Sequence, residues 1–237
     1  MNKKTRDKLL NIVRQNYEDI ADDFSDSRNY IWPELRVVIA IRQLAEKQPR
    51  KNCNVLDLGC GNGRLAELFA GQNSNYTGVE QSVKLSNLAR QKLADLKITG
   101  NIITGDVLNL NSITDKKFDL VLCIAVLPHI PSAELRRYLL RQIKNHLASD
   151  GIFIITAWNL RAQWKYKKLI WKHGAQKILG LNKMDFGDIV FPGFQQKSPR
   201  YYHAFTENKL KKILIQAGYK INKLYSDKKN IYAICKI

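Results

Sequence analysis

The sequence predicts an α/β fold in which a mostly parallel sheet carries helices on both faces and ends in an antiparallel hairpin. Two observations predict this fold. Short apolar runs alternate with helical patterns between residues 54 and 158, and such alternation indicates βαβ units. The chain then closes with a helical pattern over 207–216 and two strand patterns separated by a polar turn at 226–230.

The residues before this core predict a helical cap. Apolar residues recur at helical spacing between positions 3 and 20, and a polar run over 22–28 then breaks the pattern. Pro33 suits the first turn of a second helix, whose apolar face would pack beside the first strand. We interpret this part of the chain as a lid or entry segment.

The period of the apolar residues predicts the elements of the core in order. Strands are expected at 55–58, 76–80, 101–104, 120–126 and 152–158, with helices at 64–70, 83–96 and 133–147. A helix at 207–216 and strands at 219–225 and 231–237 follow. The expected divisions are a helical cap (1–50), a binding core (51–158), a substrate-side insertion (159–204) and a C-terminal helix and strand pair that completes the sheet (205–237).

Length and cysteine usage limit the class of protein. The 237 residues suffice for one well-buried α/β domain with accessory segments, but not for two catalytic domains. None of the four cysteines belongs to a C-x-x-C pair, so we expect reduced thiols, no metal site and a cytoplasmic protein. The longest apolar run, over 120–127, is far shorter than the ~20 residues of a membrane span, so we expect no membrane association.

The chain is strongly basic. Its 39 Lys and Arg residues against 21 Asp and Glu residues give a net charge of +18. A positive field attracts polyanions such as tRNA. The lysines are scattered over every segment, and a biased genome composition explains the same excess. Charge alone therefore leaves both explanations open.

Residues 54–64 predict a ligand-binding loop at the carboxyl edge of the sheet. Asp57 lies near the end of a short apolar strand, and three glycines follow at alternate positions before a helix, namely Gly59, Gly61 and Gly63. Glycine permits positive φ and close approach of a ligand, and the helix start directs free N–H groups toward it. The G-x-G-x-G spacing differs from the G-x-G-x-x-G of dinucleotide sites, so a pyrophosphate is not the favoured ligand.

This loop resembles motif I of the class I S-adenosylmethionine-dependent methyltransferases, where it holds the methionine end of the cofactor. The resemblance implies a Rossmann-like sheet and S-adenosylmethionine as cofactor. Glu80 ends the second strand, where a carboxylate accepts hydrogen bonds from the ribose hydroxyls. Asp106, an ordinary turn residue when taken alone, follows the third strand, where it faces the adenine amino group. The cofactor-binding residues expected on this basis are Trp32, Asp57, Gly59, Cys60, Gly61, Gly63, Glu80, Gln81, Asp106, Val107, Ile124 and Ala125.

Three further stretches resemble the eukaryotic tRNA wobble-uridine carboxymethyl methyltransferases. They are 23–28 with Trp32 and Pro33, 124–129, and the most specific block, Arg-Tyr-Tyr-His-Ala-Phe at 200–205. Those relatives esterify the carboxylate of 5-carboxymethyluridine in the anticodon. The resemblance therefore implies a carboxyl O-methyltransferase acting on tRNA. Eukaryotic relatives also use a small zinc-binding activator protein, and the sequence leaves open whether this chain needs one.

The chain departs from that family at several positions. Pro128 and Glu80 replace the usual His and Asp, and Ala204 lies where Val is common. Residues 161–199 follow no family pattern. A small-molecule O- or N-methyltransferase on the same core, and an RNA-binding protein that has lost catalysis, are therefore the alternative functions.

A carboxylate acceptor requires alignment rather than a strong base, because an acid of pKa about 4 is ionised at neutral pH. Arg28 and Arg200 are candidate cations for one carboxylate oxygen, each near aromatic residues that could hold an extruded base. Arg200 is equally consistent with a surface loop, and His129 with a helix cap. The candidate catalytic residues are Arg28, His129, Arg200, Tyr201 and His203.

The insertion provides the main sequence argument for an RNA partner. Between residues 158 and 177, aromatic residues alternate with Lys and Arg, and mixed surfaces of this kind stack bases and follow phosphates. Two alternatives predict the same pattern. One is a structural helix whose aromatic residues fill the core, and the other is a basic amphipathic helix on an anionic membrane.

Overall fold

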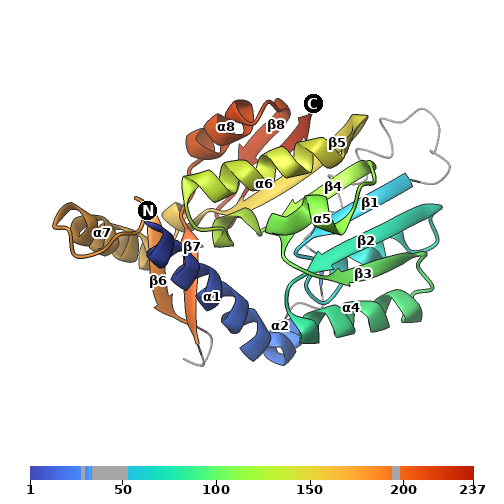
Figure 1. The fold of residues 1–237 in the computed structure, drawn as a ribbon, viewed down its shortest axis with the longest axis horizontal. Coiled ribbons are helices and arrows are strands. Elements are labelled where there is room, and N and C mark those ends of the chain that lie inside the picture. The colour runs from blue at the N-terminus through green and yellow to red at the C-terminus, as the bar shows by residue number, and fades with distance from the viewer. Residues whose placement is uncertain (28–29, 32, 34–52, 194–197) are drawn as a thin grey trace.

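A seven-stranded sheet forms the centre of the molecule, with strands in the order β3-β2-β1-β4-β5-β9-β8 (Figure 1). The computed structural model describes residues 1–27, 30–31, 33, 53–193 and 198–237. Strands β1 to β5 pair in parallel, whereas β9 runs antiparallel to β5 and β8. The sheet strands are β1 (Cys53–Leu58), β2 (Ser74–Glu80), β3 (Gly100–Thr104), β4 (Phe118–Ile124), β5 (Leu147–Trp158), β8 (Lys220–Ser226) and β9 (Asn230–Lys236). The predicted α/β fold with an antiparallel C-terminal hairpin is confirmed.

The strand order reverses between β1 and β4. From β1 the chain builds outward through β2 and β3, and it then returns to the other side of β1 to add β4 and β5. In open parallel sheets, a ligand crevice forms outside the carboxyl ends of the strands at such a reversal. This edge carries Asp57 and Ile124, at the ends of β1 and β4.

Helices cover both faces of the sheet, because each central strand buries alternate side chains on opposite sides. On β4, Val121 and Cys123 pack toward α6 and α8, whereas Leu120 and Leu122 pack toward η1 and α4. Each fully buried side chain of this size stabilises the fold by roughly 1.5–3 kcal/mol. The covering elements are η1 (Arg64–Phe69) and α4 (Val83–Asp95) on one face, and η2 (Val107–Asn109), α5 (Leu110–Ile113), α6 (Ala133–His146) and α8 (Glu207–Gln216) on the other.

Two segments differ from the sequence prediction. The expected helix at 64–70 is a 3₁₀ helix, which follows Gly63 at φ 75° without a side-chain cap and ends before Ala70, whose ψ of 133° is not helical. The polar run expected to break the helical pattern instead forms α2 (Ala21–Ser27), directly after α1 (Lys3–Asp19). The helix expected to follow Pro33 lies outside the described residues.

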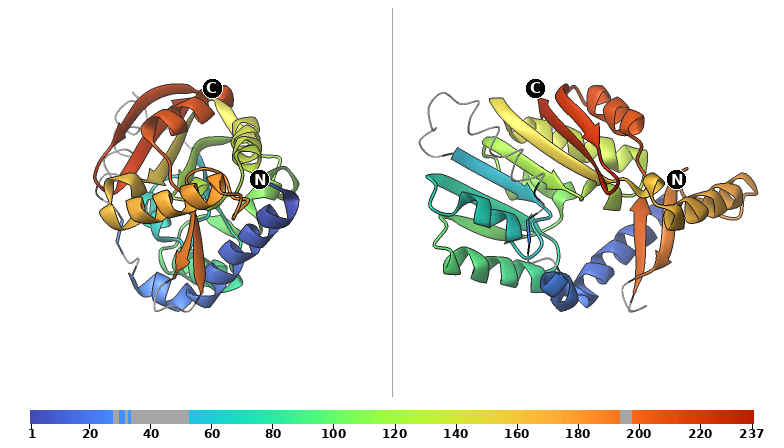
Figure 2. Two further views of the ribbon diagram at one scale, coloured as in Figure 1. Left: turned by 90° about the vertical axis from the view of Figure 1, so that its left-hand side faces the viewer. Right: turned by 180° about the vertical axis from the view of Figure 1, so that it is seen from behind.

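The N-terminal helices and the insertion lie at the carboxyl edge of the sheet (Figures 1 and 2). Leu9 and Val13 of α1 pack against Tyr201 and Met184 of the insertion. Helix α7 projects from the body of the molecule beside the ribbon formed by β6 and β7 (Figure 2). The insertion contains η4 (Leu160–Ala162), α7 (Trp164–Ile178), β6 (Asp188–Pro192) and β7 (Pro199–His203).

Within the described ranges, no helix has the length and apolar character needed to cross a membrane. The same part of the chain contains no group of three or more His, Cys, Asp or Glu residues arranged to hold a metal ion. All four cysteines are free thiols, and three of them are buried.

Candidate active site

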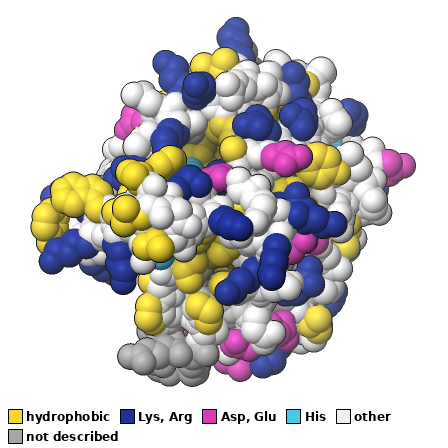
Figure 3. Space-filling view, turned by 60° about the vertical axis from the view of Figure 1, so that its left-hand side comes forward, with side chains coloured by type: hydrophobic (Ala, Val, Ile, Leu, Met, Phe, Trp, Pro, Cys, Tyr) yellow, Lys and Arg dark blue, Asp and Glu magenta, His cyan; other side chains and the backbone are white. Residues whose placement is uncertain are grey.

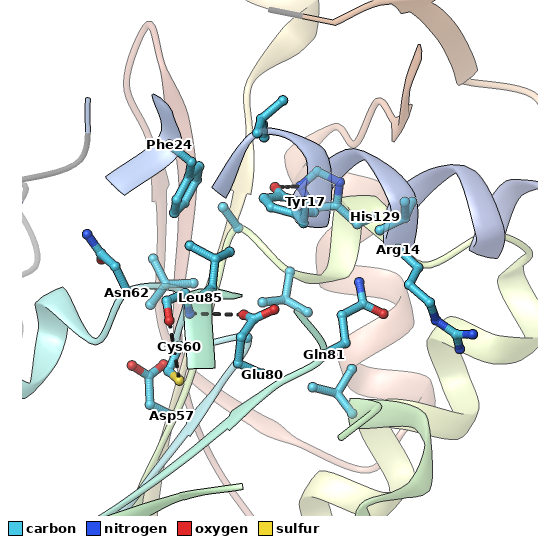
Figure 4. Close-up of a pocket in the computed structure, with 18 of the residues that line it drawn as sticks. Arg14, Tyr17, Phe24, Asp57, Cys60, Asn62, Glu80, Gln81, Leu85 and His129 are labelled. Carbon is cyan, nitrogen blue, oxygen red and sulfur yellow. Dashed lines mark hydrogen bonds between the residues drawn. The ribbon is translucent and has the colours of Figure 1, made fainter. Parts of the chain in front are cut away.

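A cavity of about 340 Å³ lies at the carboxyl ends of β1, β2 and β4, where the strand order reverses. Helices α1 and α2 cover it (Figure 4). The residues predicted to bind the cofactor that line it are Asp57, Gly59, Cys60, Gly61, Glu80, Gln81, Asp106, Val107, Ile124 and Ala125. The structure therefore brings together residues that lie up to 68 positions apart in the sequence.

The glycine-rich loop needs glycine for reasons of space as well as conformation. Gly59 and Gly61 adopt φ values of 65° and 58°, which other residues rarely adopt. A Cβ atom at Gly59 would lie 2.5 Å from Val126, and one at Gly61 would lie 3.2 Å from the ring of Phe24. The loop therefore packs directly against the exit of β4 and the covering helix α2. Gly63 faces α4 instead of the cavity, and a Cβ atom at this position would lie 3.1 Å from Ala89.

Glu80 is held in a fixed orientation at the end of β2. Its two carboxylate oxygens accept hydrogen bonds from the backbone N–H groups of Gly61, at 3.0 Å, and Ser82, at 2.9 Å. Burial raises the pKa of this carboxyl, and the backbone N–H groups of Ser82, Gly61 and Gln81 partly oppose that shift. Two carboxylate oxygens have about four acceptor positions, so the group can still accept from a ligand's hydroxyl.

Asp57 is fully buried at the end of β1 and accepts a 2.5 Å hydrogen bond from the Tyr76 hydroxyl. Burial raises its pKa to about 7, against the opposing effects of this hydrogen bond and of Arg64. A cationic group placed in the cavity beside Asp57 would offset that burial and favour the ionised carboxylate.

Asp106 and its neighbours form the third wall of the cavity. The Asp106 carboxylate caps η2 by accepting from the Leu108 N–H at 2.9 Å, and it lies 3.9 Å from the Arg14 guanidinium of α1. Val107 and Gln81 line the cavity next to it. The expected adenine end of the site therefore contains one carboxylate, one amide and an apolar surface.

The covering helices contribute residues that the sequence analysis did not identify. Ser25 accepts a 3.1 Å hydrogen bond from Asn62, and the Glu18 carboxylate accepts a 2.6 Å bond from Ser82. The Asn62 side-chain oxygen is buried and has no hydrogen-bond partner among the described residues. An unpaired acceptor in a cavity wall requires a donor, and the amino group of a bound cofactor would supply one. Asn62 belongs to the glycine-rich motif, so its position in the sequence was the available signal.

His129, in η3 (Leu127–His129), joins this cover to the exit of β4. Its Nε2 lies 2.9 Å from the Tyr17 hydroxyl. Burial lowers the pKa of His129 to about 3, a hydrogen bond with the Tyr201 backbone opposes the shift, and Arg200 adds to it. The ring is therefore neutral at physiological pH. A neutral imidazole has one N–H donor and one acceptor nitrogen, so the tautomer decides which of Nε2 and the Tyr17 hydroxyl donates.

Strand β7 separates the other candidate catalytic residues onto two sides. Arg200 and Tyr202 line the cavity. Tyr201 and His203 lie on the opposite side of the strand, where both bond to the buried Asp188 carboxylate, at 2.9 and 2.7 Å. Side chains alternate along a strand, so a block of consecutive polar residues cannot all face one cavity. The structure therefore places Tyr202 at the site and places Tyr201 and His203 in a buried network.

The backbone at the end of β4 is strained. Ala125 has φ 59°, and its N–H bonds to the Thr156 hydroxyl at 2.9 Å. The chain then enters η3, whose His129 lines the cavity. The predicted residues Arg28 and Trp32 lie outside the described residues.

The residues that line the cavity suit the binding of S-adenosylmethionine. Two glycines admit a close ligand, Glu80 offers a fixed carboxylate, and Asn62 offers an unpaired acceptor. In this arrangement, Asp57 and Asn62 would hold the methionine end, Glu80 the ribose, and Asp106 the adenine.

Comparisons with known proteins agree with this geometry. A family model described as a methyltransferase domain matches residues 49–218. A ubiquinone biosynthesis O-methyltransferase of Glaesserella parasuis is 32% identical over 142 residues, which are 58% of this chain and 59% of that protein. The chain thus spans about three fifths of that relative. A tRNA (carboxymethyluridine(34)-5-O)-methyltransferase of Schizosaccharomyces pombe is 24% identical over 235 residues, 94% of this chain and 95% of that protein.

Solved structures share the fold. A S-adenosylmethionine-dependent methyltransferase of Clostridium acetobutylicum is 18% identical with a TM-score of 0.65, covering 93% of this chain and 98% of that one. The magnesium protoporphyrin IX methyltransferase of Synechocystis, solved with bound SAH, is 20% identical with a TM-score of 0.65, covering 97% of this chain and all of that one. From the family match and the cavity together, we conclude that the chain belongs to the methyltransferase domain family and is an S-adenosylmethionine-dependent methyltransferase.

Proposed function

We propose that the protein methylates the carboxylate of a carboxymethylated wobble uridine in tRNA and produces a methyl ester. The proposal rests mainly on the position of Arg200, which lies in the wall of the cavity beside the neutral His129. The Schizosaccharomyces pombe relative, whose name states this activity, aligns along 95% of its length. The alignment therefore includes the segments at the acceptor end of the cavity as well as the cofactor-binding half. A match to the cofactor-binding half alone would give less support for a shared acceptor.

The surroundings of Arg200 suit a planar anion. Its Nε is buried and has no hydrogen-bond partner in the described part of the chain. Aromatic rings surround this end of the cavity, with Trp158 and Tyr202 only 4.7 Å apart between centroids. A guanidinium binds a carboxylate strongly, and flanking rings hold a base that has left its stack.

The reaction makes modest demands on the protein. When bound, S-adenosylmethionine supplies a methyl group attached to a positively charged sulfur. A carboxylate is already ionised at neutral pH, so no residue has to remove a proton. Arg200 orients the acceptor oxygen, and the rings of Tyr17, Trp158 and Tyr202 exclude water from it.

A small-molecule hydroxyl acceptor is the second candidate, favoured by the 32% identity to the ubiquinone biosynthesis enzyme. A hydroxyl must lose its proton during transfer, which requires a general base. His129 is the histidine that lines the cavity, and burial lowers its pKa to about 3. A base this weak suits proton removal poorly, which supports the carboxylate acceptor instead.

The test is methyl transfer to tRNA isolated from a strain that lacks the gene. The purified protein and labelled S-adenosylmethionine are incubated with this tRNA, which is then digested to nucleosides for mass spectrometry. We expect the label in one modified uridine, as an ester that mild alkali releases. Label in a different nucleoside, or transfer to small phenols but not to tRNA, would refute the proposal.

A further inference from the structure

A row of aromatic side chains leads from the cavity to helix α7. Tyr202, in the cavity wall, lies 4.7 Å from Trp158 and 5.2 Å from Phe191 between ring centroids. Phe191 lies 5.5 Å from Tyr166 of α7, and the Lys165 ammonium lies 4.7 Å above the Tyr166 ring. We call the four rings, those of Trp158, Tyr166, Phe191 and Tyr202, the aromatic row. It connects the proposed acceptor site with a cationic surface.

The part of the insertion that contains α7 carries only one sign of charge. Residues 159–184 contain seven Lys and Arg residues and no Asp or Glu. Trp164 and Trp171 are 63% and 69% exposed, and the Lys168 ammonium lies 5.6 Å above the Trp164 ring. Figure 3 shows hydrophobic side chains interspersed with Lys and Arg over this projecting part of the molecule.

We propose that the aromatic row and the lysines of α7 hold the single-stranded nucleotides next to the acceptor nucleotide. This inference rests on the proposed function, which places a tRNA base in the cavity. Bases stack on aromatic rings regardless of sequence, and ammonium groups neutralise the phosphates between them. The exposed Lys165 and Lys168 lie beside rings, as a track for a nucleotide chain requires.

The row favours RNA over a membrane as the occupant. The end of α7 and the turn after it expose Ile178, Leu179 and Leu181, which would suit an anionic lipid surface. The hydrophobic cluster that contains the four rings of the row includes none of these three exposed residues. A lipid bilayer would leave unexplained why the rings continue from α7 into the cavity.

Fluorescence anisotropy with a labelled seven-nucleotide single-stranded RNA tests the inference in the presence of S-adenosylhomocysteine. The variant Lys165→Ala/Lys168→Ala removes two cations of α7, one over the Tyr166 ring of the row and one over the neighbouring Trp164 ring. Lys211→Ala/Lys212→Ala removes two exposed cations of α8 and is the charge-matched control. We expect the slope of log affinity on log salt to fall by about 1–2 in the first variant and by less than 0.5 in the control.

Tyr166→Ala tests the stacking contribution separately. We expect RNA affinity to fall about fivefold or more, with unchanged binding of S-adenosylhomocysteine and no large loss of thermal stability. Equal salt slopes in the two lysine variants, or unchanged affinity in Tyr166→Ala, would overturn the inference. Binding to phosphatidylserine vesicles that requires Lys165 and Lys168, with no binding to RNA, would overturn it in favour of a membrane surface.

The outcome separates this inference from the proposed function. RNA binding needs no methyl acceptor in the probe, so binding along the row without methyl transfer to tRNA refutes only the proposed function. Transfer to tRNA with the same kcat/KM in wild type, Tyr166→Ala and the lysine variant refutes only the present inference.

Discussion

The Tyr17 hydroxyl lies 2.9 Å from Nε2 of His129, and this hydrogen bond joins helix α1 to the exit of strand β4. The two rings also meet edge to face, with centroids 5.3 Å apart. Burial keeps the imidazole neutral, and the ring forms part of the cavity wall. The contact holds helix α1 over the cavity. The low pKa of His129 means that this histidine is not a strong base for proton transfer.

Methyl transfer is therefore expected to depend little on pH. Because burial lowers the pKa of His129 to about 3, the ring stays neutral throughout the range from pH 6 to 9. A carboxylate acceptor is ionised over the same range, so the single-turnover rate should be nearly flat. A rate that rises tenfold per pH unit through neutrality would indicate a hydroxyl or amine acceptor and a general base.

Substitutions at the acceptor end should separate the roles of Arg200 and His129. We expect Arg200→Ala to lower kcat/KM about 100-fold, because it removes a charge-assisted hydrogen bond, and Arg200→Lys to lower it less. His129→Ala should lower it less than about tenfold, since it removes a positioning contact. The reverse order, measured under the same conditions, would show that the histidine performs the chemistry.

Gly61→Val should abolish binding of S-adenosylmethionine. Any side chain at this position takes the space between the loop and the Phe24 ring, which a Cβ would approach to 3.2 Å, and it strains the backbone at φ 58°. Gly71→Val is the matched control, because Gly71 has φ 71° with no atom within 4 Å of an added Cβ. Calorimetry should detect binding in the control only, and normal binding by Gly61→Val would contradict the cofactor site.

Asp57 should make the cofactor-free protein less stable as pH rises. Its pKa is about 7 in the folded chain and about 3.9 in the unfolded chain, so the folded chain retains a proton between these values. The free energy of unfolding therefore falls from about pH 4 to pH 7, by up to about 4 kcal/mol.

The variant Asp57→Asn removes this titration. Urea denaturation should show that it is more stable than wild type at pH 8, and that this gain exceeds its gain at pH 5 by about 2–3 kcal/mol. Asp115→Asn, at an exposed position, serves as the control. A gain that is the same at both pH values would show that Asp57 is ionised in the folded protein throughout.

The exposed tryptophans of α7 should contribute little to stability. Trp164 and Trp171 are 63% and 69% exposed, so replacing either by Ala should change the thermal midpoint by less than about 2 °C. Phe153→Ala, at a fully buried position, should cost about 3–5 kcal/mol by comparison. A large loss in the tryptophan variants would show that these rings fill a core in solution.

The sequence predicted the sheet and most of the residues that line the cavity at its carboxyl edge, because both depend on local patterns. Apolar runs identified the central strands, and Glu80 and Asp106 follow strands whose carboxyl ends meet at one edge. Gly63 was expected at the cofactor, yet it faces Ala89 of α4. The glycine pattern alone did not distinguish contact with a ligand from contact with a helix.

The acceptor end was harder to predict, because it depends on contacts between distant segments. The aromatic block 200–205 has no apolar alternation, so the sequence did not show which of Tyr201 and Tyr202 faces the cavity. The polar segment that forms α2 gave no helical pattern. Its Phe24 packs near Gly61, a tertiary contact that local propensity does not reveal.

The most direct test of the account compares two anticodon stem-loop RNAs that differ at one group. One carries 5-carboxymethyluridine at the wobble position, and the other carries the corresponding neutral amide, which is nearly the same size. We predict methyl transfer to the carboxylate RNA, with an alkali-labile product, and transfer to the amide at least about 100-fold slower, because Arg200 binds the anion and no base activates an amide. Equal transfer to both RNAs, or transfer to neither by protein that binds S-adenosylmethionine, would contradict the proposal that the protein methylates the carboxylate of a wobble uridine.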